Sequence, residues 1–282
     1  MTGESRKVGS ANGVAPHRRV SVVIPAMNEA ENLEFILPLL PSVVDEVVLV
    51  DGRSTDATIE VTRLLRSGVI IVLQDGMGKG DALVAGFKAA SGEIIVAMDA
   101  DGSADPAEIP RFLEALDQGA DFAKGTRFAP GGGSADITRL RRAGNGVLTW
   151  LVNQLFGTRY TDLCYGFNAF RAGCLPYLCI DCDGFEVETL INIRVAKAGL
   201  QVTEVASFEH ARLFGVSNLH AARDGRRVLM TILREWLSRS SSAARTPVKS
   251  RETESMAYGG DAVVDLLGRV ATPVEAQSAP PP

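Results

Sequence analysis

Two acidic residues separated by one position, Asp99 and Asp101, follow a strongly apolar stretch that ends at Met98. Two carboxylates on one irregular turn can bind the same hard cation. Mg²⁺ or Mn²⁺, held by few protein carboxylates and by substrate phosphates, is the chemistry that such a pair suits. A solvated turn, or capping of the following helix by Asp105, explains the same residues without catalysis. The spacing alone does not separate these alternatives, so the surrounding elements must.

Short β-branched runs alternate in this chain with longer segments that have the apolar spacing of helices. Strands are predicted at Val20–Ile24, Glu46–Val50, Val69–Leu73 and Glu93–Met98. Helices are predicted at Glu29–Leu40, Thr55–Ser67, Gly80–Ser91 and from Asp105 to about Asp117. This alternation predicts an α/β fold with a mostly parallel central sheet flanked by helices. Because ligands bind beyond the carboxyl ends of such strands, the polar clusters at 25–29, 51–56 and 99–103 should converge on one crevice.

Two familiar phosphate-binding loops are excluded by the residues at their key positions. The glycine-rich segment around Lys79 is not a P-loop, which would need glycine in place of Leu73 and Ser or Thr in place of Gly80. A dinucleotide-binding fingerprint would follow the first strand, where the chain has IPAMNEAEN. Neither P-loop nor classical dinucleotide chemistry is expected.

The composition of the chain argues against several classes of protein. The chain has 282 residues, 46% of them hydrophobic, and its formal net charge of −5 gives no electrostatic footprint for wrapping nucleic acid. No apolar run approaches the roughly 18 residues of a spanning helix, and the N-terminus lacks the apolar core of a signal peptide. The expected location is cytoplasmic, including the cytoplasmic face of a membrane. We expect a flexible arm at 1–18, a globular domain at 19–239 and a disordered tail at 240–282.

Six segments, in order along the chain, resemble those of a known enzyme family. They are VVIPAMNEAENL, VDGRSTDAT, GKGDALVAGF, DADGSADP, GTRF and DLCYGFNAF. From about Val20 to Trp236 the chain resembles the inverting family 2 glycosyltransferases, and within them the dolichyl- or polyprenyl-phosphate mannosyltransferases and glucosyltransferases. The resemblance implies a single A-type glycosyltransferase (Rossmann-like) domain, a nucleotide-diphosphate sugar as donor and Mg²⁺ or Mn²⁺ as cofactor.

The resemblance also implies which residues bind the donor. Asp101 is expected to ligate the metal, with Asp99 facing the sugar-nucleotide and Ser103 adding an oxygen. The residues expected to bind the donor are Pro25, Asn28, Glu29, Asp51, Lys79, Ala100, Arg212 and Ser217. The family often has two consecutive Asp residues where this chain has Asp51 alone, so the base, guanine or uracil, stays open. For Lys79 an ordinary solvated lysine is the alternative.

Arginines dominate the acceptor side of the sequence. Arginine binds phosphate oxygens through paired hydrogen bonds. In similar lipid-phosphate enzymes, an arginine of the GTRF-like motif and one from the following basic segment hold the acceptor phosphate. That resemblance implies Arg127 and Arg142, with Arg139 as the alternate, and it counts Arg127 as catalytic together with the acidic pair. A solvated basic helix face is the alternative for these arginines.

The acceptor decides the mechanism. A phosphate monoester is already anionic, so its attack needs positioning and charge stabilisation, whereas a hydroxyl acceptor needs a base, for which Glu186 and Glu188 are candidates. The predicted function is inverting transfer of a hexose, mannose or glucose, from GDP-mannose or UDP-glucose to polyprenyl phosphate. Two alternatives stay open: the same donor chemistry with a soluble hydroxyl acceptor, and a non-catalytic nucleotide-sugar-binding protein.

The segment at 221–239 predicts an amphipathic helix in which arginines are mixed with Val, Leu, Met, Ile and Trp236. Such a helix can lie at an anionic membrane interface, or it can dock its apolar face on the domain. Peripheral membrane contact is therefore one of two explanations for this helix.

Overall fold

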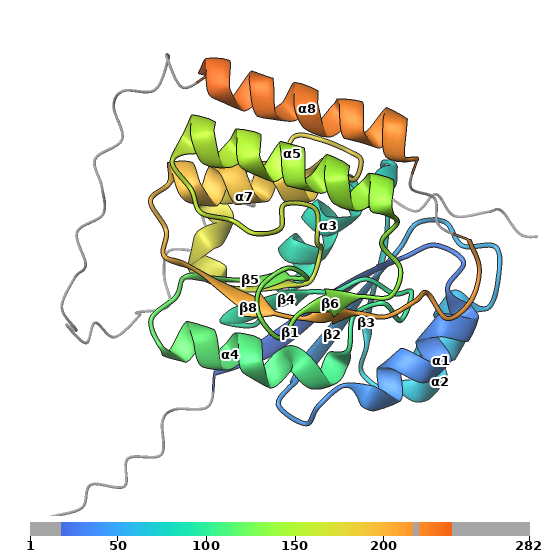
Figure 1. Cartoon of the computed structure of the whole chain (residues 1–282). Helices are drawn as coiled ribbons and strands as arrows, with labels where there is room; N and C mark the ends of the chain where they lie inside the picture. Colours follow the sequence, from blue (N-terminus) through green and yellow to red (C-terminus); the bar gives the residue numbers. More distant parts are fainter. Residues whose placement is uncertain (1–17, 217–219, 239–282) are drawn as a thin grey trace, which may run out of the picture. The chain divides into compact units, whose positions relative to one another are not determined.

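The computed structural model of this chain describes residues 18–216 and 220–238 (Figure 1). The chain divides into two units, Met1–Arg245 and Thr246–Pro282, and the second lies outside the described residues. The predicted arm and tail also lie outside them, apart from Arg18, so the predicted domain boundaries stay predictions.

Strands and helices alternate through the described residues. The strands are β1 Val20–Ala26, β2 Glu46–Asp51, β3 Ile70–Leu73, β4 Ile94–Ala97, β5 Phe122–Thr126, β6 Gly133–Ser134, β7 Asn168–Arg171, β8 Val202–Ala206 and β9 Phe208–Glu209. The helices are α1 Ala30–Leu39, α2 Thr58–Leu65, α3 Gly78–Ala89, α4 Ile109–Asp117, α5 Arg139–Phe156, α6 Leu175–Leu178, α7 Val187–Lys197 and α8 Ala221–Leu237. Two short 3₁₀ turns are η1 Pro106–Glu108 and η2 Ala172–Cys174.

Seven strands form one sheet in the order β3-β2-β1-β4-β7-β5-β8. Neighbouring strands are parallel except β7, which runs antiparallel to both β4 and β5. In the register of the first two strands Ala26 lies opposite Asp51, and β4 ends with Ala97 opposite Val23. The carboxyl ends of these strands therefore share one edge, and the predicted α/β fold with a mostly parallel sheet is confirmed.

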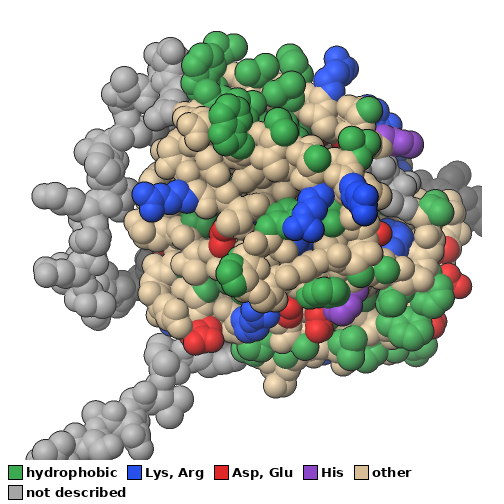
Figure 2. Space-filling model, in the orientation of Figure 1, with side chains coloured by type: hydrophobic (Ala, Val, Ile, Leu, Met, Phe, Trp, Pro, Cys, Tyr) green, Lys and Arg blue, Asp and Glu red, His purple; other side chains and the backbone are tan. Residues whose placement is uncertain are grey.

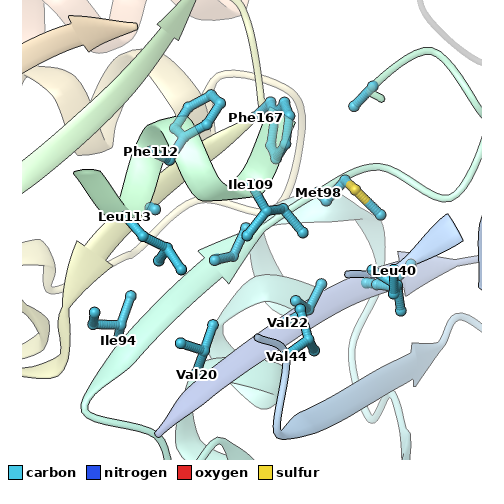
Figure 3. Packing of buried hydrophobic residues seen from close by; sticks show 14 of the residues in the cluster. Val20, Val22, Leu40, Val44, Ile94, Met98, Ile109, Phe112, Leu113 and Phe167 are labelled. Atoms are coloured by element: carbon cyan, nitrogen blue, oxygen red, sulfur yellow. The ribbon is translucent and has the colours of Figure 1, made fainter. Parts of the chain in front are cut away.

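Helices cover both faces of this sheet because its central strands are apolar on both sides. Val22, Leu49 and Val96 pack toward α1 and α4, in the core shown in Figure 3. The alternate residues Val23 and Val48 pack on the opposite face, toward α3 and α7. The two-residue period of a strand thus divides the apolar side chains between two cores.

A further helical layer, α5 and α8, lies over α7 (Figure 1). Val152 of α5 and Val228 and Ile232 of α8 share a small core with Ile193 of α7. The predicted helix at 221–239 is thus confirmed over Ala221–Leu237, and its inner side docks on the domain. Within the described residues no helix has the length and apolarity to cross a membrane.

The four predicted strands and the helices between them occur within a few residues of their predicted bounds. The helix predicted from Thr55 begins only at Thr58, because Asp56 accepts the Thr58 backbone N–H at 3.0 Å. Asp105 caps the segment after β4 as predicted, but the chain first forms the 3₁₀ turn η1. Strand β7 and the full length of α5 were not predicted.

Candidate active site

The carboxyl ends of β1 and β4, the start of α3 and the segment after β9 enclose a cavity of about 610 Å³, the crevice. The polar clusters after β1 and β4 converge on it, whereas the cluster at 51–56 does not line it. The predicted site residues that line the crevice are Pro25, Glu29, Lys79, Asp99, Ala100, Asp101, Ser103, Arg127 and Arg212.

The acidic pair sits on a turn that brings both carboxylates into the crevice. Gly102 has a φ of 78°, in the left-handed region that glycine adopts at little cost. The backbone N–H of Ser103 then donates to Asp101 Oδ1 at 3.0 Å. The side chains of Asp99 and Asp101 remain 35% and 24% exposed, so both can reach a ligand.

Lys79, in the first turn of α3, links Asp99 to a buried glutamate. Its Nζ lies 2.6 Å from Asp99 Oδ1 and 2.5 Å from Glu188 Oε1. A Cβ on Gly166 would lie 2.7 Å from this Nζ, so a larger residue there would displace the ammonium. Burial lowers the pKa of Lys79, but the charges of Asp99 and Glu188 outweigh that effect and hold the pKa above its usual value. The solvated alternative for Lys79 is wrong, since its side chain is 11% exposed.

Arg212 links Asp101 to Glu29 in a similar way. Its guanidinium lies 3.2 Å from Asp101 Oδ2, and it also pairs with Glu29. The segment that carries Arg212 is held in place because Asn32 Oδ1 accepts the Phe214 backbone N–H at 3.0 Å. Burial raises the pKa of Glu29 although Arg212 opposes it. Each carboxylate of the acidic pair thus has one resident cation as its partner.

The donor set of the crevice fits a magnesium-type ion. Among the described residues no three His, Cys, Asp or Glu side chains are grouped to hold a metal, so the acidic pair is the candidate for an ion here. Ser103 also lines the crevice, and its predicted contact with the ion stays a prediction. Mg²⁺ characteristically takes one or two carboxylates and completes its shell with water and substrate phosphates. His210 does not line the crevice, and its ring lies 5.0 Å from the Phe208 ring.

Two predicted donor-binding residues, Asn28 and Asp51, do not line the crevice. Asn28 is exposed, and its Oδ1 accepts the Thr55 backbone N–H at 2.7 Å, which braces the loop after β2. Asp51 is 2% exposed and accepts from the Ser54 backbone N–H, while its Oδ1 has no hydrogen-bond partner among the described residues. Ser217 lies outside the described residues. Their predicted contacts with the nucleotide remain predictions.

Arg127 is buried between the carboxylates of Asp162 and Glu209. Its Nε lies 2.7 Å from Asp162 Oδ2 and its Nη1 lies 3.0 Å from Glu209 Oε1, while its side chain is only 3% exposed. Burial raises the pKa of Asp162, but hydrogen bonds from Arg127 outweigh this and hold the pKa below its usual value. The guanidinium borders the crevice with most of its donors already used by protein carboxylates.

A second cavity of about 300 Å³, the groove, runs between the first halves of α5 and α8. Its wall is mostly apolar and includes Leu140 and Leu148 of α5 and Val228 of α8. The groove and the crevice share six lining residues, which are Arg127, Arg141, Cys164, Phe185, Glu188 and Asp224. A charged crevice and an apolar groove therefore meet at one junction.

In the basic segment at the start of α5, the arginine that lines the cavities is Arg141, whereas Arg139 and Arg142 were predicted. Arg139 and Arg142 are exposed and line neither cavity, and the Arg142 guanidinium lies 5.1 Å from the centre of the Phe128 ring. Arg141 lines both cavities, and its Nη1 lies 2.8 Å from Asp136 Oδ2. From α8, Arg227 also lines the crevice. The sequence did not single out Arg141 and Arg227, because the rotational position of a residue on its helix decides which of several neighbouring arginines faces a cavity.

The sequence of the chain is similar to those of known glycosyltransferases. The family model described as Glycosyl transferase family 2 matches residues 21–177. The chain is 30% identical to glycosyltransferase AglJ of Haloferax volcanii, over 76% of this chain and 71% of that protein. It is 31% identical to an undecaprenyl-phosphate mannosyltransferase of Micrococcus luteus, over 75% of this chain and 91% of that protein.

A solved structure of glucosyl-3-phosphoglycerate synthase from Mycobacterium tuberculosis, in complex with Mn²⁺, uridine diphosphate and glucosyl-3-phosphoglycerate, has a similar fold. Its TM-score is 0.61 at 24% sequence identity, over 77% of this chain and 80% of that chain. The predicted A-type fold is confirmed.

Proposed function

The chain belongs to glycosyl transferase family 2, and from that premise we propose that it transfers a hexose from a nucleotide-diphosphate sugar to polyprenyl phosphate. Mannose from GDP-mannose and glucose from UDP-glucose are the first candidates. The relative named for mannosyl transfer to undecaprenyl phosphate supports a lipid acceptor.

The junction of the crevice with the groove carries this proposal. The crevice offers carboxylates and cations, which suit a sugar diphosphate and its metal ion. The groove offers Leu140, Leu148 and Val228, which suit an isoprenoid chain rather than a sugar or a small acid. An acceptor whose chain lay in the groove would place its phosphate at the junction, next to the donor sugar.

The reaction needs no base. An oxygen of the acceptor phosphate forms a bond to the anomeric carbon while the bond from that carbon to the donor diphosphate breaks, and a single displacement inverts the configuration. Mg²⁺ or Mn²⁺ bound at Asp99 and Asp101 would supply charge stabilisation for the departing diphosphate. Arg212 lies beside Asp101 and can donate to the same phosphates once a bound ion satisfies that carboxylate.

Arg141 and Arg227 are the arginines that we assign to the acceptor phosphate. Arg141 lines both cavities, with a side chain 25% exposed, and Arg227 of α8 also lines the crevice. Arg127 has a positioning role in this proposal, because its bonds to Asp162 and Glu209 fix the wall that both cavities share.

The test is transfer of radiolabelled sugar from GDP-mannose and UDP-glucose, in parallel, into organic-extractable polyprenyl phosphate. Arms with Mg²⁺, Mn²⁺ and EDTA accompany each donor. Metal-dependent label in the organic phase from one donor is the expected result. Absence of label from both donors, with donor binding demonstrated, would overturn the lipid acceptor.

A soluble hydroxyl acceptor is the second candidate, and the position of Glu188 favours it. This carboxylate lies at the junction, and burial raises its pKa although Lys79 opposes the shift, which suits a group that accepts a proton. Glu188→Gln should abolish transfer to a hydroxyl but spare transfer to a phosphate. Glu186→Gln is the matched control, because Glu186 is the neighbouring buried glutamate and lines neither cavity.

A further inference from the structure

The outer sides of α5 and α8 form an apolar face that no described part of the chain covers. Figure 2 shows hydrophobic side chains gathered over this part of the molecule. The exposed apolar residues are Leu140, Val147 and Trp150 of α5 and Leu229, Met230, Leu233, Trp236 and Leu237 of α8. A continuous apolar surface of this kind marks an interaction site more often than a solvated one. We name it the α5/α8 face.

The exposed charges on the two helices are all positive. α5 has no acidic residue, and the two acidic residues of α8, Asp224 and Glu235, are 3% and 4% exposed. The exposed basic residues of the two helices are Arg139, Arg142, Arg223, Arg226, Arg227 and Arg234. Arg223 pairs with Asp224, Arg234 pairs with Asp181 and Arg227 lines the crevice, which leaves Arg139, Arg142 and Arg226 for this face. The whole chain carries a net charge of −5, so this concentration of arginine is local.

Both tryptophans of the chain, Trp150 and Trp236, lie on this face and are 62% and 43% exposed. Tryptophan is enriched where an apolar phase meets water, because its ring is apolar and its N–H is polar. Apolar residues, tryptophan and arginine together are typical of a helix that lies in the plane of a membrane surface.

The face also continues into the groove. Leu140 is 75% exposed and at the same time lines the groove, and Ala221 and Ala222 border it from the start of α8. A chain leaving a bilayer under this face would enter the groove without crossing water.

We propose that the α5/α8 face docks on an anionic lipid bilayer, with the apolar residues inserted and Arg139, Arg142 and Arg226 against lipid phosphates. The proposal rests on the proposed function only for the reason to dock, since a polyprenyl phosphate resides in a membrane. A second copy of the chain fits this face less well, because a symmetric contact would bring Arg139, Arg142 and Arg226 of both copies together, and no ion pair of these three is found among the described residues.

Vesicle binding by the full chain tests the docking without any assay of activity. We expect the protein to float with vesicles of phosphatidylcholine mixed with phosphatidylglycerol, to float less with phosphatidylcholine alone, and to lose binding as salt is raised. Because the chain has no tryptophan elsewhere, its fluorescence should shift to the blue only with vesicles that bind.

Matched variants locate the surface. Val147→Ser with Met230→Ser should reduce flotation, whereas Leu64→Ser, at an 84% exposed leucine of α2 on the other side of the sheet, should not. Arg226→Glu should weaken binding at least about fivefold, the effect of one arginine near an anionic surface. Arg63→Glu, which makes the same charge change at an exposed arginine of α2, should leave binding unchanged.

Failure of the docking and failure of the proposed function give different results. If docking alone fails, the full chain does not float, yet it transfers sugar to a short-chain polyprenyl phosphate in detergent. If the function alone fails, the chain floats and transfers nothing. The docking proposal is overturned if flotation is absent, if the α2 controls reduce it as much as the α5/α8 variants, or if the α5/α8 variants change only a monomer–dimer equilibrium.

Discussion

The donor region, residues 20–117, and the acceptor region, residues 122–238, each contain a charged cluster, and the two clusters are held in opposite ways. In the donor region Asp99 and Asp101 each pair with one cation and stay partly exposed. In the acceptor region Arg127 is saturated by two carboxylates and is 3% exposed. The first arrangement can exchange a resident cation for a ligand, whereas the second fixes a wall. Charged residues near the site therefore divide into those that can bind a ligand and those that hold the fold.

Asp162→Asn removes one of the two carboxylates that hold Arg127, and of the changes considered we expect it to have the largest effect, a loss of unfolding free energy. The change leaves a buried guanidinium partly unpaired, which costs about 3–5 kcal/mol of unfolding free energy. Asp136→Asn, at the more exposed pair with Arg141, should cost less than about 1 kcal/mol. Urea unfolding of both variants measures the difference, and equal losses would show that Arg127 and Arg141 are held alike.

Asp101→Asn tests the exchangeable arrangement. We expect transfer to fall about a hundredfold to a thousandfold, the range for loss of a group that stabilises developing charge. The unfolding free energy should change little, because Asp101 is 24% exposed. Asp105→Asn, at the cap of η1, is the control and should keep its activity. Steady-state kinetics with saturating Mg²⁺ decide the outcome, and an active Asp101→Asn would remove this residue from the metal site.

Arg141→Ala and Arg142→Ala test which arginine meets the acceptor. Loss of a charge-assisted hydrogen bond costs about 1.5–3 kcal/mol, so kcat/KM for polyprenyl phosphate should fall about tenfold to a hundredfold in Arg141→Ala. Arg142→Ala should stay within about twofold, because Arg142 lines neither cavity. A larger loss in Arg142→Ala than in Arg141→Ala would instead support the sequence-based prediction that Arg142 binds the acceptor phosphate.

The pH dependence of stability is the smallest expected effect. Burial raises and Arg127 lowers the pKa of Asp162, and the net pKa lies below its usual value. The stabilisation is therefore complete above the unfolded-state pKa of about 3.9 and is lost as pH falls through the folded value. The stability gap between the wild type and Asp162→Asn should be constant from neutral pH down to about 5 and shrink below about 4. A gap that shrinks already near neutral pH would contradict this assignment.

The donor region was more predictable because most of its site residues lie at or shortly after the carboxyl ends of strands. Asp99 and Asp101 come directly after β4, and Pro25 lies within β1, so local pattern and strand order suffice. The crevice at the edge of a parallel sheet follows from topology alone.

The acceptor region was less predictable because its site depends on contacts far apart in the chain. Lys79 meets Glu188 across 109 positions, and Arg127 meets Glu209 across 82. Choosing Arg141 over Arg142 requires the rotation of α5 about its axis, which its neighbours α7 and α8 set. No local pattern carries that information.

If the acceptor chain lies in the groove, two glycines of α5 should respond differently to a larger side chain. Gly144 lines the groove and Gly146 does not, and a Cβ at either position would meet nothing within 4 Å. Gly144→Leu and Gly146→Leu therefore add the same side chain to the same helix, with the same gain in helix propensity.

The measurement is kcat/KM for polyprenyl phosphate in both variants, with donor binding measured alongside. Gly144→Leu should fall at least about tenfold with donor affinity unchanged, and Gly146→Leu should stay within about twofold of the wild type. Equal transfer by the wild type and both variants would contradict the account.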